Sequence, residues 1–195
     1  GLHTFKIGKN SHVKYIEKHY GEGNGSGERI MNPTMTAELE RGASMEIETV
    51  QIGGIDSTNR KTVITAGEDC EVNVAERIMS DGHQNVVSDT EVILNGRGAK
   101  ARINSRSVAK GESTQLFYPK MTGNTECFGH VQCDSIIMDN AKIRSIPEIC
   151  ANSVDARLIH EAAIGKIAGD QITKLMTLGL TAEEAEEKIL AGLLK

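Results

Sequence analysis

The sequence predicts a mainly β protein that ends in a short helical tail, and it favours a β-solenoid for the β part. Three observations carry this prediction. Apolar and polar residues alternate with a period of two from about residue 3 to residue 163. The residues on one face of this alternation are small. After Gly165 the apolar residues recur with helical spacing instead. These two periods distinguish strands from helices.

Alternation is clearest in segments 70–75, 99–107 and 131–137. It predicts strands with one buried and one solvated face. In the second segment the residues of the buried face are Ala99, Ala101, Ser105 and Ser107. Frequent strands with short glycine-led turns are compatible with a sandwich, a barrel or a solenoid. The small inner residues and the absence of tryptophan favour the solenoid, because thin stacked layers need no bulky core residue. The glycine-rich stretch 21–27 is expected to be a flexible loop.

The tail carries its own helix signals. Gly179 stands where a left-handed residue would end one helix. Thr181 and Glu184 have the spacing of a capping box for the next. Helices this short are marginal alone in water, so the tail is expected to pack on its own β body or on a partner. We therefore divide the chain into a β core, residues 1–165, and a helical subdomain, residues 166–195.

Composition restricts the function. The 195 residues carry a formal charge of −5 and no basic run, so nucleic acid is not an expected partner. No apolar run is long enough to span a bilayer and no leader is recognisable, so no membrane association is expected. The four cysteines follow no disulfide pattern, which favours reduced thiols and the cytoplasm. No Walker A motif and no G-x-S-x-G motif occur, and we expect no enzymatic activity.

Candidate chemistry lies near the change of period. His160 and Glu161 are adjacent, and alternation places them on opposite faces. One interpretation is a histidine at the core edge beside an exposed glutamate, and the other is an imidazole and a carboxylate offered to a metal. A strand end or a bulge would let both reach one ion. Cys133 has the position of a small buried hydrophobe. Cys150 and Cys127 fall near turns, where a thiol would be accessible.

Several motifs resemble one family in order and spacing. They are G-H-V-Q-C-D-S-I-I-M-D at 129–139, I-P-E-I at 146–149, H-E-A-A-I-G-K-I at 160–167, G-D-Q-I at 169–172 and L-G-L-T-A-E-E-A at 178–185. Together they resemble the C-terminal core of the SufB/SufD family of iron–sulfur cluster assembly proteins. The likeness extends more loosely to 8–17 and 42–51 and so covers nearly the whole chain.

The resemblance implies a right-handed parallel β-helix followed by a small helical tail. It implies a dimer through the end of the β-helix, with a homologue or a second copy. It also implies docking of the tail on a Suf-type ABC ATPase, in a cytoplasmic scaffold complex that holds iron–sulfur clusters transiently. The expected docking residues form the apolar stripes of the tail. They are Ile172, Leu175, Met176, Ala185, Ile189, Leu190 and Leu193.

The resemblance also names candidate cluster ligands. His160 matches a histidine of both the SufB and SufD types, and Glu161 matches a glutamate of the SufB type. Cys133 matches the cysteine of the family's C-D-S block. Two further family cysteines are missing, because Ala141 and Leu158 occupy their positions. The nearby Cys150 is the best available replacement, with two chains together supplying a full ligand set.

Two other functions remain open. The chain could be a metal-free structural subunit of the SufD kind that completes a dimer. It could also be a β-helical enzyme acting on carbohydrate, which needs paired carboxylates along one face. Scattered acidic residues and few aromatic platforms disfavour that second alternative.

Overall fold

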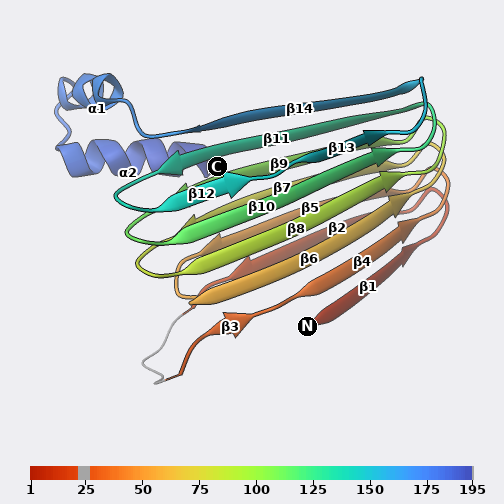
Figure 1. Cartoon of the computed structure of the whole chain (residues 1–195), viewed down its shortest axis with the longest axis horizontal. Coiled ribbons are helices and arrows are strands. Elements are labelled where there is room, and N and C mark those ends of the chain that lie inside the picture. Colours follow the sequence, from red (N-terminus) through yellow and green to blue (C-terminus); the bar gives the residue numbers. More distant parts are fainter. Residues whose placement is uncertain (22–26, 195) are drawn as a thin grey trace.

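A computed structural model describes residues 1–21 and 27–194. The chain forms a parallel β-solenoid of about 6 turns followed by two C-terminal helices, which confirms the predicted fold class (Figure 1). The coils stack from β1 at one end to β14 at the other, and the helices lie at one end of the strands. Most of the expected flexible loop, residues 22–26, lies outside the described residues.

Two sheets face each other across the interior. Sheet A follows the order β1-β4-β6-β8-β10-β12, with β3 beside β6 and β13 beside β10. Its strands are β1 (Leu2–Ile7), β3 (Ile30–Met31), β4 (Thr34–Leu39), β6 (Ser57–Ala66), β8 (Asn85–Leu94), β10 (Thr114–Gly123), β12 (Lys142–Ser145) and β13 (Glu148–Ala151). Sheet B follows the order β14-β11-β9-β7-β5-β2. Its strands are β2 (His12–His19), β5 (Ser44–Ile52), β7 (Glu71–Ser80), β9 (Lys100–Ala109), β11 (Cys127–Ile137) and β14 (Ala156–Gly165). Consecutive coils pair in parallel, so equivalent residues stack in rows.

The core lies between the two sheets and is built from aliphatic and sulfur-containing side chains. Met45, Ile64 and Met121 are fully buried there, and Cys70 is 1% exposed. Ala99 and Ala101 also face inward, as the alternation predicted. Small inner residues let the two sheets approach closely, and this is how a chain with few aromatic residues still fills its interior.

Stacked turns explain one glycine. At Gly98 the backbone has φ +74°, a left-handed conformation that residues other than glycine rarely adopt. A Cβ atom at this position would also lie 2.4 Å from the Asp69 carboxylate of the preceding coil. Glycine therefore permits both the turn and the close stacking of coils.

The change of period corresponds to the change of architecture. Strand β14 ends at Gly165, and the helices α1 (Gly169–Met176) and α2 (Ala182–Leu193) follow. Thr181 and Glu184 form the predicted capping box of α2, and Gly179 has φ +96°. None of the described helices is long and apolar enough to cross a membrane. The division into two domains stays a prediction.

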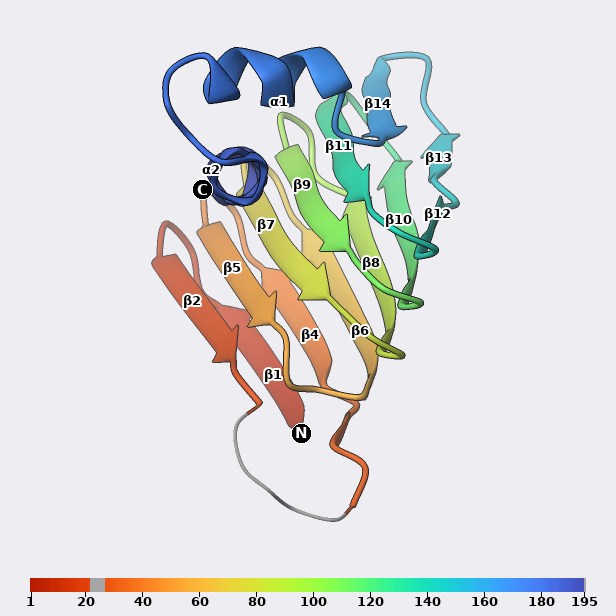
Figure 2. The same ribbon diagram turned by 90° about the vertical axis from the view of Figure 1, so that its left-hand side faces the viewer.

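Helix α2 packs on the outer side of sheet B (Figure 2). Lys110 of β9 pairs with Glu186 at 3.5 Å. The Arg106 guanidinium donates to the Leu193 carbonyl at 3.4 Å. Ala185 and Leu190 are buried. Part of the apolar stripe of α2 therefore packs on the chain's own β body, which is one of the two packing surfaces expected for the tail.

Candidate functional site in the last coil

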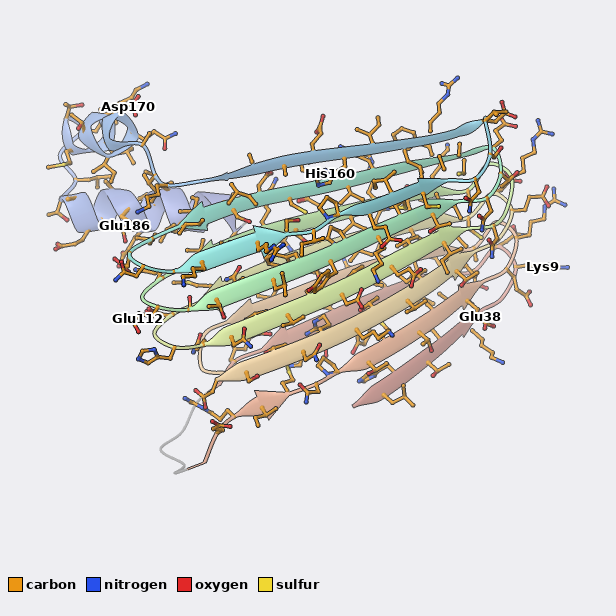
Figure 3. All side chains as sticks on the ribbon, viewed as in Figure 1. Lys9, Glu38, Glu112, His160, Asp170 and Glu186 are labelled. Atoms are coloured by element: carbon orange, nitrogen blue, oxygen red, sulfur yellow. The ribbon has the colours of Figure 1, made fainter. Side chains whose placement is uncertain are left out.

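His160 lies inside the last coil of the solenoid. Strand β14 pairs with β11 in an unbroken parallel register that sets His160 beside Val131. Val131 is fully buried, so the imidazole of His160 points to the interior (Figure 3). Its Nε2 atom is buried and has no hydrogen-bond partner among the described residues. A buried polar atom without a partner is costly, and in a native structure it calls for an explanation.

Glu161 faces the other way. Its Oε2 lies 3.2 Å from Nε2 of His130 on the outer face of sheet B. The strand end or bulge that would let both side chains reach one ion does not occur here, because β14 continues in regular register to Gly165. Regular pleating separates the two adjacent side chains, so His160 and Glu161 of one chain do not meet at one ion.

Cys133 shares the interior with His160. It lies on β11, two residues beyond Val131, and is 2% exposed. The Ser145 hydroxyl of sheet A donates to its sulfur at 3.7 Å. Burial raises the pKa of the Cys133 thiol, and the hydrogen bond from Ser145 lowers it by less. The negative charges of Glu76 and Asp134 raise the pKa further. The Cys133 thiol therefore ionises only at a higher pH than an unperturbed cysteine.

A buried carboxylate lies farther along the same interior face, and sequence reasoning missed it. Glu76 is 4% exposed and accepts hydrogen bonds from Ser88 at 2.6 Å and from Thr90 at 3.4 Å. Ser105, the strand neighbour of Cys133, donates to its other oxygen. The signal was present, since Glu76 continues the inward alternation of Val72 and Val74 where an apolar residue is expected.

Cys150 is not part of this interior group. It lies on β13 beside Thr122, whereas the preceding Ile149 lies beside the buried Met121. Alternation therefore turns the Cys150 thiol outward, where it donates to Asn152 at 3.2 Å. The expectation that Cys127 is accessible in a loop is wrong. Cys127 begins β11 and is 6% exposed, because the inward alternation already starts there.

The described part of a single chain does not assemble a complete metal site. Within residues 1–21 and 27–194, no group of three or more histidine, cysteine, aspartate or glutamate side chains could hold a metal ion. The interior contributes Cys133 and His160, while Cys150 and Glu161 face outward. Strand β14 pairs only with β11 among the described strands. The exposed Ile159 and Ile164 lie on this strand, and the exposed Ile149 is on β13. The last coil is therefore open.

The predicted docking residues divide into two groups. Ala185 and Leu190 are buried within the chain, and Ile189 and Leu193 line a groove of about 590 Å³ between α2 and the ends of β11 and β14. No residue of α1 is buried, and Met176 is 46% exposed. Ile172 and Leu175 are half-buried. Leu178, in the connection between the helices, is 76% exposed. The accessible apolar surface of the tail is thus on α1 and the turn after it.

Known proteins similar to this chain agree with the motifs. Residues 1–193 match the family described as SUF system FeS cluster assembly, SufBD core domain. An iron–sulfur cluster assembly SufBD family protein of Methanocaldococcus jannaschii is 34% identical over 192 residues, which cover 97% of this chain and 60% of that protein. One of Pyrococcus horikoshii is 28% identical over 201 residues, covering 99% of this chain and 59% of that protein.

The chain spans about three-fifths of the length of these two relatives. The family match nevertheless extends from the first coil to the end of α2 and includes every candidate ligand described above. This chain belongs to the SufBD family of iron–sulfur cluster assembly proteins.

Proposed function

We propose that this chain is a scaffold subunit of a Suf-type complex that holds nascent iron–sulfur clusters at the open last coil. The observation that carries this proposal is the pairing of family membership with Cys133 and His160 on one interior face. A thiolate is a soft ligand that binds iron firmly, and an imidazole can be displaced at transfer. The cluster is cargo here, and each chain supplies only part of its ligands.

The second part of the proposal is a dimer through the end of the solenoid, with a second copy or a homologue. An exposed edge strand presents unpaired backbone groups and is a ready template for another chain. Strand β14 combines such an edge with the exposed apolar side chains Ile159 and Ile164. A partner there would cover the open coil and bring two sets of ligands together. Side chains of the partner would also lie near the outward-facing Cys150 and Glu161 and could complete a ligand set with them.

The third part is docking of the tail on an ABC-type ATPase, which would supply the nucleotide chemistry that this sequence lacks. Met176 and Leu178 support this part, because they are large apolar side chains left exposed at the end of α1 and in the turn after it, and α1 has no buried residue. Exposed apolar patches of this kind are typical of interaction sites.

Anaerobic reconstitution with iron and sulfide tests the scaffold function. The purified chain is incubated with both, desalted, and measured for iron, for sulfide and for its absorption spectrum. We expect retained iron and sulfide together with charge-transfer absorption. A chain that dimerises yet retains neither would be the metal-free structural subunit instead. That alternative is kept because Ala141 and Leu158 replace two family cysteines.

A further inference from the structure

The outer face of β9 carries an unusual row of charges. Its outward residues are Lys100, Arg102, Asn104 and Arg106, three cations and one amide. Two carboxylates flank this row on the adjacent strands, Glu71 beside Lys100 and Asp134 beside Arg106. The chain as a whole has a net charge of −5. A concentration of positive charge on an acidic protein is a local feature with its own electrostatic field. This row and its strand neighbours are called the β9 face below.

The neighbouring strands extend the β9 face. Phe128 of β11 lies in register between Lys100 of β9 and Arg157 of β14. His130 lies in register beside Arg102. Lys100, Arg102 and Arg157 are exposed, and none of them forms an ion pair with any described residue. These cations are therefore available to a ligand, and Phe128 offers it an apolar surface between two of them.

The β9 face has a small, partly open cavity at its Arg106 end, called the seat below. This cavity of about 280 Å³ is lined by Ala75, Glu76, Arg77, Asn104 and Arg106. Arg77 and Arg106 are direct neighbours on adjacent strands, and Arg77 pairs with Glu48 at 2.9 Å. Like charges side by side on a sheet are unfavourable unless counter-charges reach them.

Two polar atoms at this cavity lack partners. Nε of Arg106 and Oδ1 of Asn104 are buried and make no hydrogen bond to any described residue. Rotation of the Asn104 amide by half a turn would place its NH₂ group at the same position. Both side chains would then donate into the cavity, and paired donors with a guanidinium suit a carboxylate.

We propose that the β9 face binds an acidic segment of a partner protein, with one carboxylate seated between Arg77 and Arg106. Lys100 and Arg102 stand two residues apart on β9, about 6.6 Å, which is also the spacing of alternate side chains in an extended peptide. Charge complementarity selects an acidic polypeptide. This inference does not rest on cluster binding or on the ATPase, because its evidence is the exposed cations and the cavity on the outer face of sheet B, a face that also carries Glu161.

The probe is a fluorescein-labelled peptide of eight glutamates, and the measurement is its fluorescence anisotropy with the full chain at about 20 mM and 200 mM salt. The test variants are Arg102→Glu, which changes an exposed residue, and Arg106→Gln, which changes the seat. The matched control is Lys61→Glu, the same change of charge on the exposed outer side of sheet A. Circular dichroism melts verify that each variant is folded.

We expect saturable binding at low salt that weakens as salt screens the charges. Arg102→Glu should weaken it about five-fold or more, and Lys61→Glu less than about two-fold. Absence of saturable binding at low salt would overturn the proposal. So would an equal loss in Arg102→Glu and Lys61→Glu, because that would show attraction by net charge alone. Displacement of the peptide by inorganic phosphate beyond a chloride control of equal ionic strength would assign the seat to a free oxyanion instead.

If Arg106→Gln is unfolded, the result for Arg102→Glu decides the test, since Arg102 is exposed and its substitution is not expected to unfold the chain. If Arg106→Gln is folded, we expect a loss at least as large as that of Arg102→Glu, because the buried donors would lose their charge. Peptide affinity unchanged in a folded Arg106→Gln variant would remove the seat from the proposal.

Discussion

The Ser145 hydroxyl donates a hydrogen bond to the sulfur of Cys133 at 3.7 Å, and this contact joins β12 of sheet A to β11 of sheet B inside the solenoid. Sheet A contributes the donor and sheet B the acceptor, so neither strand alone defines the environment of the thiol. Glu76, farther along the same interior, adds a negative charge. The reactivity of Cys133 is therefore a property of the assembled solenoid.

The first prediction concerns that reactivity. Burial and the charge of Glu76 raise the pKa of Cys133, so its thiolate should form only above the pH at which an exposed thiol ionises. Alkylation followed by mass spectrometry across pH 7 to 10 should show Cys150 reacting before Cys133. Glu76→Gln should lower the pKa of Cys133 and speed its alkylation at a given pH. Ser88→Ala, which removes a donor to Glu76 and no charge, is the control. Faster reaction of Cys133 than Cys150 would contradict the assigned environments.

The second prediction concerns stability in acid. Burial of Glu17 would raise its pKa, but the charge and hydrogen bond of Arg60, together with His19, outweigh burial and lower it. A carboxyl whose folded pKa is lowered stabilises the fold above its unfolded pKa and loses that contribution as pH falls through the folded value. The free energy of unfolding in urea should therefore decline below about pH 4.5. In Glu17→Gln the decline should be smaller, and an unchanged pH profile would argue against this ion pair.

Removal of Arg60, the partner of Glu17 in this ion pair, should lower the free energy of unfolding more than removal of Glu17. Arg60 is 4% exposed, and its Nη1 pairs with Glu17. Arg60→Ala would leave the carboxylate buried without its counter-charge, which typically costs about 3 to 5 kcal/mol. Arg29→Ala is the matched control, because Arg29 pairs with Asp56 on the surface. Equal urea midpoints for Arg60→Ala and Arg29→Ala would contradict the importance of the interior pair.

The third prediction compares cysteines in cluster retention. Cys70 is in the core and donates to backbone carbonyls, so Cys70→Ser should retain as much reconstituted iron as the unmodified protein when it is folded. Cys150→Ser should retain less iron, because Cys150 is the accessible thiol of the last coil. Cys133→Ser should also retain less iron, because Cys133 lies on the same interior face as His160, one inward position along β11 from the register partner Val131. Equal iron in all three variants and the unmodified protein would leave the proposed ligands without support.

The fourth prediction separates docking from folding in the tail. Deletion of residues 168–195 should abolish co-purification with the cognate ATPase, but it also uncovers the surface of sheet B that α2 packs on. Leu178→Glu is sharper, because Leu178 is 76% exposed and its substitution should not alter stability. We expect loss of co-purification with an unchanged melting temperature. Leu190→Ala should instead cost about 2 to 5 kcal/mol, because Leu190 is buried. Undiminished ATPase binding by Leu178→Glu would remove that residue from the docking surface.

The sequence by itself determined the type of each element. Alternation at Ala99, Ala101 and Cys133 fixed which side chains face inward, because successive residues of a strand point to opposite faces. The capping box of Thr181 and Glu184 located the start of α2, because its contacts are local. Opposite directions for His160 and Glu161 followed from the same alternation.

Only the tertiary structure decided which inward residues meet across the interior. The contact of Ser145 with Cys133 depends on how one sheet is placed over the other, and no periodicity encodes that placement. Cys150 turned outward because β13 pairs with β10 in a particular register, and a shift of one residue would have turned it inward. The adjacency of Arg77 and Arg106 likewise results from the stacking of coils 29 residues apart. Long-range register, which depends on the packing of the whole core, therefore determined the composition of each site.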